Sequence, residues 1–211
     1  MPETALLLCN GEPPDRRVAR LLARSAGLLV AADGGANYAR SLGLTPDVII
    51  GDLDSVKAST LRAFRRTGII RVRRQDNTDM EKALDYLRDH DVTRVFLLGA
   101  TGRRLDMTLA NLTVLWRYVP SMDIVVVGTG WYAVPVQGMR TMHARRGTTV
   151  SLIPNGACEG VTLRGLRYPL TRATLSSGVA AVSNVVQRGK FSVSIARGKA
   201  LVVVLTQFSD I

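Results

Sequence analysis

Short apolar runs alternate with amphipathic stretches over the first 128 residues of the chain. The apolar runs have the length of strands, and the stretches between them repeat apolar residues at helical spacing. Strands are predicted at 4–9, 28–32, 47–50, 69–72, 94–98 and 123–127, and helices at 15–25, 36–42, 59–66, 78–89 and 106–118. Strands that alternate with helices are typical of a largely parallel sheet covered on both faces. We therefore predict a three-layer α/β/α domain at residues 1–128.

The pattern changes after Gly128, where runs rich in β-branched residues are separated by Pro, Gly, Asn and Ser and no helical period follows. Strands are predicted at 148–153, 160–163, 180–186, 191–195 and 200–205. Residues 131–136 fit either region. Many short strands with turn residues between them are typical of a small antiparallel sandwich or barrel. We predict an all-β sandwich domain at residues 129–211.

Composition indicates a folded protein without membrane spans. Apolar residues make up 46% of the 211 positions and charged residues 21%, which excludes intrinsic disorder as the main description. The longest apolar runs are far shorter than the about 18 residues that span a bilayer. The N-terminus carries Glu3 and no basic leader region, so the first apolar run is interpreted as a strand and not as a signal peptide. A cytoplasmic location is therefore expected. Cys9 and Cys158 have no partner at metal-ligand spacing, so both are expected to be buried.

The net charge of +11 raises the question of a nucleic-acid partner. Residues 1–128 carry 18 basic and 15 acidic residues, whereas residues 129–211 carry 10 and 2. The basic excess therefore belongs to the second region, where it is dispersed and Arg145-Arg146 is the only adjacent pair. We expect no nucleic-acid partner, with a basic nucleic-acid-binding module as the alternative from another class.

Acidic residues follow four of the predicted strands of the first domain. They are Asp33, Asp52, Asp54, Asp76, Asp79 and Asp106. In an open parallel sheet the ligand crevice lies beyond the carboxyl ends of the strands, so these side chains are expected at one edge. Crowded carboxylates oppose folding unless a cation neutralises them, and Mg²⁺ prefers oxygen ligands shared with substrate phosphates. In an extended Asp52-Leu53-Asp54 segment both acids would point to the same side.

Glycines and helix starts support a phosphate site at the same edge. Glycines that permit close backbone approach occur at Gly34, Gly35, Gly51, Gly99 and Gly102. Helices that begin after Gly35 and near Thr78 and Asp106 offer N–H groups to phosphate. Taken singly, Asp33, Thr78 and Asp106 are equally consistent with helix N-caps. The conjunction of these features at four strand ends is what indicates a metal–nucleotide site.

Other nucleotide and hydrolase signatures are absent. The sequence has no Gly-x-x-x-x-Gly-Lys-Ser/Thr loop, no kinase-type glycine loop, and no Gly-x-Gly-x-x-Gly after the first strand. His90 and His143 are the only histidines, which makes His-based triads and zinc sites poor interpretations. A transferase that uses Asp-x-Asp to hold a nucleotide diphosphate, such as a nucleotidyl or glycosyl transferase, remains an alternative function.

Four segments resemble, in order and spacing, the motifs of thiamine pyrophosphokinases. They are Asp33-Gly34-Gly35-Ala36, Gly51-Asp52-Leu53-Asp54-Ser55, Gln75-Asp76-Asn77-Thr78-Asp79 with Glu81-Lys82-Ala83-Leu84, and Gly102-Arg103-Arg104-Leu105-Asp106. The second domain is similar to that family's thiamine-binding domain at 150–154, 165–170 and Ser183-Asn184. The resemblance implies a Mg²⁺-dependent homodimer that transfers the pyrophosphoryl group of ATP to the hydroxyl of thiamine, giving AMP and thiamine diphosphate.

The resemblance also implies roles for individual residues. Asp52, Asp54 and Asp79 would hold the metal and the triphosphate as the catalytic residues. The nucleotide site would be formed by Asp33, Gly34, Gly35, Gln75, Thr78, Gly102, Arg104 and Asp106. Ser183 and Asn184 would contact thiamine, and we add Trp131 as a candidate ring wall, although a core tryptophan is the more common role. The sequence departs from the family pattern at Arg103, Met107 and Val185, where a glycine, a histidine and an acidic residue are typical.

Overall fold

The computed structural model describes residues 3–73, 76–177 and 181–206. The chain divides into two compact units, Met1–Gly128 and Thr129–Ile211. Each unit buries its own set of apolar side chains. Among the described residues, no helix has both the length and the apolar character needed to cross a membrane.

The first unit is built on a parallel sheet. Its strands are β1 (Thr4–Leu8), β2 (Leu28–Ala32), β3 (Val48–Gly51), β4 (Gly68–Arg71), β5 (Arg94–Leu98) and β6 (Asp123–Gly128). They pair in the order β6-β5-β1-β2-β3-β4, and every pair is parallel. Residues 5–8 of the central strand β1 are fully buried, because helices exclude water from both faces of the sheet.

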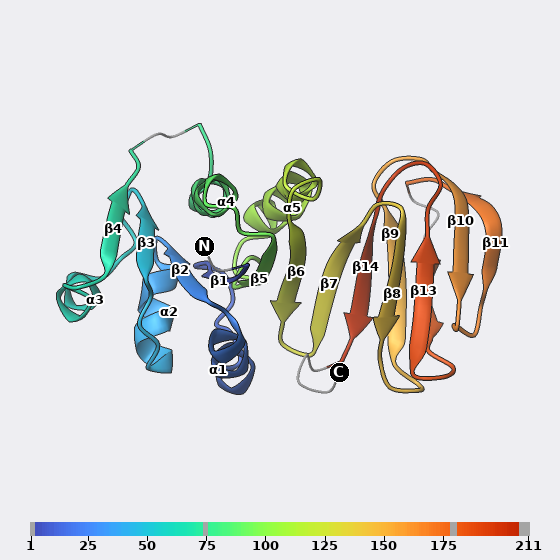
Figure 1. Ribbon diagram of the computed structural model, residues 1–211, viewed down its shortest axis with the longest axis horizontal. Coiled ribbons are helices and arrows are strands. Elements are labelled where there is room, and N and C mark those ends of the chain that lie inside the picture. The colour runs from blue at the N-terminus through green and yellow to red at the C-terminus, as the bar shows by residue number, and fades with distance from the viewer. Residues whose placement is uncertain (1–2, 74–75, 178–180, 207–211) are drawn as a thin grey trace. The chain divides into compact units, whose positions relative to one another are not determined.

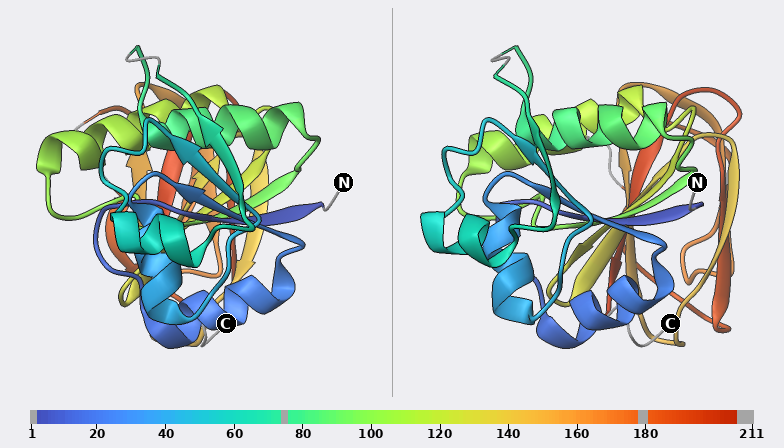
Figure 2. Two further views of the ribbon diagram at one scale, coloured as in Figure 1. Left: turned by 90° about the vertical axis from the view of Figure 1, so that its left-hand side faces the viewer. Right: turned by 60° about the vertical axis from the view of Figure 1, so that its left-hand side comes forward.

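Helices cover the two faces of this sheet. They are α1 (Arg16–Ser25), α2 (Gly35–Leu42), α3 (Ala58–Ala63), α4 (Asp79–Asp89) and α5 (Leu105–Val114), the last followed by the 3₁₀ turn η1 (Leu115–Arg117). Helices α4 and α5 lie on one face, and α1 and α2 lie on the other (Figure 2). The predicted three-layer α/β/α architecture is confirmed.

The strand order reverses between β1 and β5. The chain adds β2, β3 and β4 on one side of β1 and then returns to place β5 and β6 on the other side. Beyond the strands the two connections remain paired, since the Cys9 N–H donates to the Leu98 carbonyl (2.8 Å) and the Gly11 N–H to the Gly99 carbonyl (2.7 Å). A reversal of this kind opens a crevice at the carboxyl ends of the strands.

The second unit is all-β (Figure 1). Its strands are β7 (Trp131–Val136), β8 (Met139–His143), β9 (Thr149–Pro154), β10 (Cys158–Arg164), β11 (Leu170–Leu175), β12 (Ala181–Val185), β13 (Lys190–Ser194) and β14 (Ala200–Leu205). One antiparallel sheet has the order β12-β9-β14-β7 and the other the order β11-β10-β13-β8. Alternate residues of β14 are buried, as in a sheet with one face in a core.

Two strands of the second unit, β8 and β11, were not predicted. Met142 is the buried residue of β8 and Leu175 that of β11, so neither segment shows the apolar alternation by which a strand is detected. Pairing with β13 and β10, and not a local sequence pattern, determines that these two segments form strands. Cys9 and Cys158 are both buried and free, as expected.

Candidate active site

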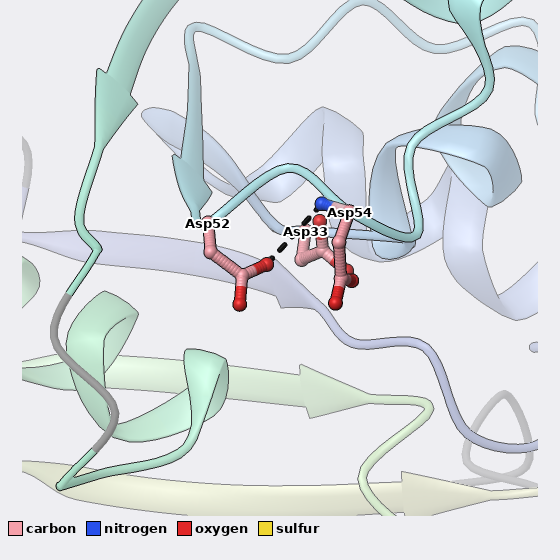
Figure 3. A group of neighbouring side chains, drawn as sticks. All are labelled: Asp33, Asp52 and Asp54. Atoms are coloured by element: carbon pink, nitrogen blue, oxygen red, sulfur yellow. Dashed lines mark hydrogen bonds between the residues drawn. The ribbon is translucent and has the colours of Figure 1, made fainter.

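Three carboxylates meet at the carboxyl ends of β2 and β3 (Figure 3). Asp33, Asp52 and Asp54 each offer an oxygen, and these oxygens lie within 4.8 Å of one another. Asp33 is 3% exposed, and its Oδ1 is buried without a hydrogen-bond partner. A buried acceptor without a donor is normally satisfied by an ion or water, and three carboxylates match the oxygen chemistry of Mg²⁺. The residues present therefore fit a hard divalent cation.

A tight turn, and not an extended segment, brings Asp52 and Asp54 together. Leu53 has a φ of +69° and is only half buried, so the expected extended Asp-x-Asp geometry is wrong. The Asp54 N–H donates to the Asp52 carboxylate (3.2 Å), which closes the turn. A positive φ is costly for a side chain as large as Leu, and such backbone strain is concentrated at functional sites.

Asn37 on α2 fixes the loop that carries these two acids. Its Nδ2 donates to the Ser55 carbonyl (2.9 Å), and its Oδ1 accepts from the Lys57 N–H (3.1 Å) and the Thr60 hydroxyl (2.9 Å). Asn37 was not predicted from the sequence, because its role depends on a contact between α2 and a loop that no local pattern encodes.

The burial of Asp33 and the crowding of acidic groups shift the pKa of the Asp33 carboxyl. Burial raises the pKa of its carboxyl above the ordinary value, and the neighbouring Asp79 and Asp54 charges raise it further. The Gly34 N–H opposes this increase by donating to the carboxylate. Its backbone is also left-handed, with a φ of +44°. Sequence analysis placed Asp33 in the lining of the site; the structure groups it with the two metal candidates.

Asp79 lies beside the group but is paired elsewhere. It is the first residue of α4, and its Oδ1 accepts from Nζ of Lys82 (2.9 Å), whose side chain is 3% exposed. A Cβ at Gly51 would lie 3.0 Å from Oδ1 of Asp79 and 2.9 Å from Cβ of Asp33, and the φ of Gly51 is +149°. Gly51 thus leaves the space in which the two acids approach each other. Metal binding by Asp79 stays a prediction.

Thr78 is the N-cap of α4. Its hydroxyl accepts from the Glu81 N–H (3.2 Å), and the Glu81 carboxylate accepts from the Thr78 N–H (2.9 Å), which makes a capping box. Glu81 also pairs with Arg117 (2.6 Å). Of the three N-cap interpretations this one holds, whereas α2 is capped at Gly34 and Asp106 lies in the first turn of α5. Contact of Thr78 with a nucleotide stays a prediction.

A pocket of about 420 Å³ opens next to the acidic group. The predicted site residues that line it are Asp33, Thr78, Asp79, Gly102 and Arg104. It is also lined by Cys9, Asn10, Gly11, Met107 and Asn111, which sequence analysis did not assign. Residues 9–11 carry no charge, and their place in the wall follows from the β1–β5 reversal, which cannot be seen in the sequence pattern.

Arg104 and Asp106 form an exposed ion pair beside the pocket. The Arg104 Nε donates to the Asp106 carboxylate (3.1 Å), and this bond holds the pKa of Asp106 at about 2. The neighbouring Arg103 lies 5.8 Å from the Tyr38 ring centroid and has a φ of +58°. A glycine adopts that backbone without strain, which is consistent with the glycine that the resemblance leads us to expect where this chain has Arg103.

The remaining predicted residues of the first unit are placed as follows. Gly34 and Gly35 begin α2, and a Cβ at Gly35 would lie 2.0 Å from the Leu8 carbonyl oxygen, so α2 starts in direct contact with β1. Asp52 and Asp54 belong to the acidic group, and Ser55 links that loop to the pocket wall. Gln75 lies outside the described residues.

In the second unit, the side chain of Asn184 is buried and forms hydrogen bonds with the backbone of Tyr168. Its Oδ1 accepts from the Tyr168 N–H (2.9 Å), and its Nδ2 donates to the Tyr168 carbonyl (2.7 Å), which joins β12 to the 165–169 turn. Ser183 is exposed, with a φ of +57°, and its N–H donates to the Ser151 hydroxyl (3.1 Å). Trp131 is half buried at the start of β7. Thiamine contacts by all three residues stay predictions.

Comparison with known proteins gives matches in both units. Residues 19–126 match the family described as thiamin pyrophosphokinase, catalytic domain, and residues 139–200 match its vitamin B1 binding domain. The chain is 30% identical to thiamine pyrophosphokinase 1 of Arabidopsis thaliana, over 90% of this chain and 81% of that protein.

Solved structures share the fold. A thiamin pyrophosphokinase from Geobacillus thermodenitrificans superposes with a TM-score of 0.84 at 25% identity, covering 99% of this chain and 100% of that one. One from Candida albicans gives 0.87 at 18% identity, covering 98% and 90%. With the resemblance in the motifs confirmed by both family matches, the chain belongs to the thiamine pyrophosphokinase family.

Proposed function

We propose that this chain transfers the pyrophosphoryl group of ATP to the hydroxyl of thiamine, giving thiamine diphosphate and AMP, and that the pocket of the first unit holds ATP. The observation that carries the proposal is the group of three carboxylates of Asp33, Asp52 and Asp54, which lies next to that pocket. The chain that holds this group is a member of the thiamine pyrophosphokinase family. Family membership favours this reaction over the nucleotidyl- and glycosyl-transferase alternatives.

We assign Asp33, Asp52 and Asp54 to hold Mg²⁺, with Asp79 as the predicted further ligand. Bound there, the ion would neutralise charge on the reacting phosphates. The unpartnered Oδ1 of Asp33 supports this assignment, because a cation would satisfy it and remove the repulsion that raises the Asp33 pKa.

The chain's own groups supply positioning. The thiamine hydroxyl attacks the β-phosphorus and AMP leaves, so the triphosphate must be held across its length. N–H groups at the start of α4 and the guanidinium of Arg104 point to such a role, since both favour phosphate oxygens. Asp106 keeps the Arg104 fork in a defined orientation. Contacts of Gln75, Thr78 and Asp106 with the nucleotide belong to this proposal.

We further propose that the second unit holds thiamine and that the enzyme is a homodimer. The match of residues 139–200 to the vitamin B1 binding domain supports the first part. Ser183 would contact the aminopyrimidine directly, Trp131 would pack against a ring, and Asn184 would act by fixing the Tyr168 backbone. The dimer rests on the family resemblance alone.

The test is incubation of the full chain with ATP, Mg²⁺ and thiamine, followed by separation of AMP from ADP. We expect AMP and thiamine diphosphate to form in equal amounts, with no formation when EDTA replaces Mg²⁺. Stoichiometric ADP with thiamine monophosphate as the product would contradict the proposal. AMP release that does not depend on thiamine would indicate one of the other transferase functions.

A further inference from the structure

A second hollow, far in sequence from the acidic site, lies within the second unit. It has a volume of about 760 Å³ and is lined by residues at the end of β10 and the start of β11. Figure 1 labels these two strands. Three arginines line it: Arg164 at the end of β10, Arg172 in β11 and Arg188 in the β12–β13 connection. Its lining includes residues of the 165–170 segment, but none of the individual residues to which ATP, metal or thiamine contacts were assigned.

The three arginines are exposed and have no counter-ion in the lining of the hollow. No acidic residue lines it, and residues 129–211 hold only Glu159 and Asp210 as acids. Among the residues that the structure describes, none of the three guanidinium groups takes part in a hydrogen bond or ion pair. Arg197, by contrast, lies 3.9 Å from Glu159. Like charges in the lining of one hollow repel each other, and a bound anion relieves that repulsion.

The frame that carries these arginines is held by hydrogen bonds. The Gln187 N–H donates to the Gly165 carbonyl (2.9 Å), which ties the Arg188 connection to the turn after β10. The Arg172 N–H donates to the Thr162 hydroxyl (3.2 Å), which ties β11 to β10. A preorganised frame lowers the entropy cost of ordering a ligand.

The lining also defines the chemistry of an occupant. Guanidinium forks match phosphate oxygens in pairs, and the combined charge of three arginines is neutralised more fully by a di- or triphosphate than by one carboxylate or one monophosphate. Leu166, Pro169 and Leu170 add an apolar floor next to the cations. We propose that this hollow binds a small molecule that carries a di- or triphosphate group. This site goes beyond the proposed function and does not depend on it.

The experiment titrates the full chain with inorganic pyrophosphate in EDTA, so that no metal recruits anions to the first unit, and maps the site by hydrogen exchange. We expect saturable binding that protects segments 162–172 and 187–188. Arg172→Ala and Arg188→Ala should each weaken binding by about tenfold, and Arg188→Lys by less, because it keeps the charge but loses the fork.

Arg197→Ala is the matched control. Arg197 pairs with Glu159 near the start of β10, roughly 16 Å along the strand from Arg164, so the variant removes the same charge away from the hollow and should leave the affinity unchanged. Equal weakening in this control, absence of binding, or affinities that are the same in every variant would overturn the proposal. The proposal would also be overturned if the substitutions of Arg172 and Arg188 weakened the binding of a single-stranded oligonucleotide more than that of pyrophosphate, because that result would indicate a nucleic-acid surface. ADP that binds more tightly than pyrophosphate through the same arginines would identify an organic diphosphate, and equal affinity would identify free pyrophosphate; both support the site.

Discussion

The two units use polar side chains in opposite ways. In the first unit, loops from separate βα connections reach one edge of a parallel sheet, and they bring Asp33, Asp52 and Asp54 together with a buried oxygen that has no donor. In the second unit, antiparallel strands pair with near neighbours, and Asn184 satisfies both polar groups of the Tyr168 backbone. The first unit therefore keeps oxygen atoms that a ligand can bind, whereas in the second unit Asn184 is satisfied by the protein itself.

This difference follows from topology and charge together. A parallel sheet gathers the carboxyl ends of its strands, so residues distant in sequence converge there. The first unit has 15 acidic residues to gather, and the second unit has 2. We therefore expect polar substitutions in the first unit to change activity more than stability, and polar substitutions in the second to change stability first.

The largest expected effect is an exception within the first unit. Asp79→Asn leaves the buried ammonium of Lys82 without its partner, which should lower the free energy of unfolding by about 3 kcal/mol. Lys82→Met removes the buried charge itself and leaves Asp79, which is 29% exposed, to be solvated, so it should cost less than about 1 kcal/mol. Urea denaturation of both variants measures the asymmetry. Equal losses would show that Lys82 is not effectively desolvated.

Asp54→Asn should have the next largest effect, on turnover alone. Removing this carboxylate should lower kcat by more than about a hundredfold, or about 2.7 kcal/mol of transition-state stabilisation, because it removes a metal ligand. The melting temperature should stay the same or rise, since acidic crowding is relieved. Asp91→Asn is the control, because Asp91 is exposed with a φ of +57°, a conformation that Asn tolerates. Near-normal turnover of Asp54→Asn at limiting Mg²⁺ would place the metal elsewhere.

Sequence pattern was sufficient for the three-layer architecture, because helical and strand periods are local. It also predicted that Asp33, Asp52 and Asp54 lie at one edge of the sheet, where the structure groups them. It did not identify the turn at Leu53 or the support from Asn37, since both depend on contacts between elements. Residues 9–11 were missed for the same reason: their position in the pocket wall requires the strand order.

Asn184→Ala tests whether a buried polar side chain of the second unit acts mainly on stability. Loss of both hydrogen bonds to the Tyr168 backbone should lower the free energy of unfolding by about 2 kcal/mol. The KM for thiamine should rise as the 165–169 turn shifts, with the KM for ATP unchanged. Ser183→Ala is the counterpart, because Ser183 is exposed and should change only the KM for thiamine. Unaltered stability in Asn184→Ala would break the contrast between the units.

The smallest effect concerns the pH dependence of stability at Asp33. Because the Asp33 pKa is raised in the native state, the folded protein holds this proton more tightly than the unfolded chain. Metal-free protein should therefore lose stability as the pH rises from the ordinary Asp pKa of 3.8 through the raised value, and the loss should persist above it. Asp33→Asn, which stays neutral, should remove this component and raise the melting temperature at neutral pH in EDTA. Mg²⁺ should then stabilise the unsubstituted protein more than the variant, because a ligand that binds only the native state stabilises it more the more tightly it binds. Melting curves of both proteins across this pH range, with and without Mg²⁺ and with Asp91→Asn in parallel, measure the difference. If the difference in melting temperature between Asp33→Asn and the unsubstituted protein did not vary with pH, Asp33 would be well solvated. The first unit would then contain no acid whose pKa is raised by burial.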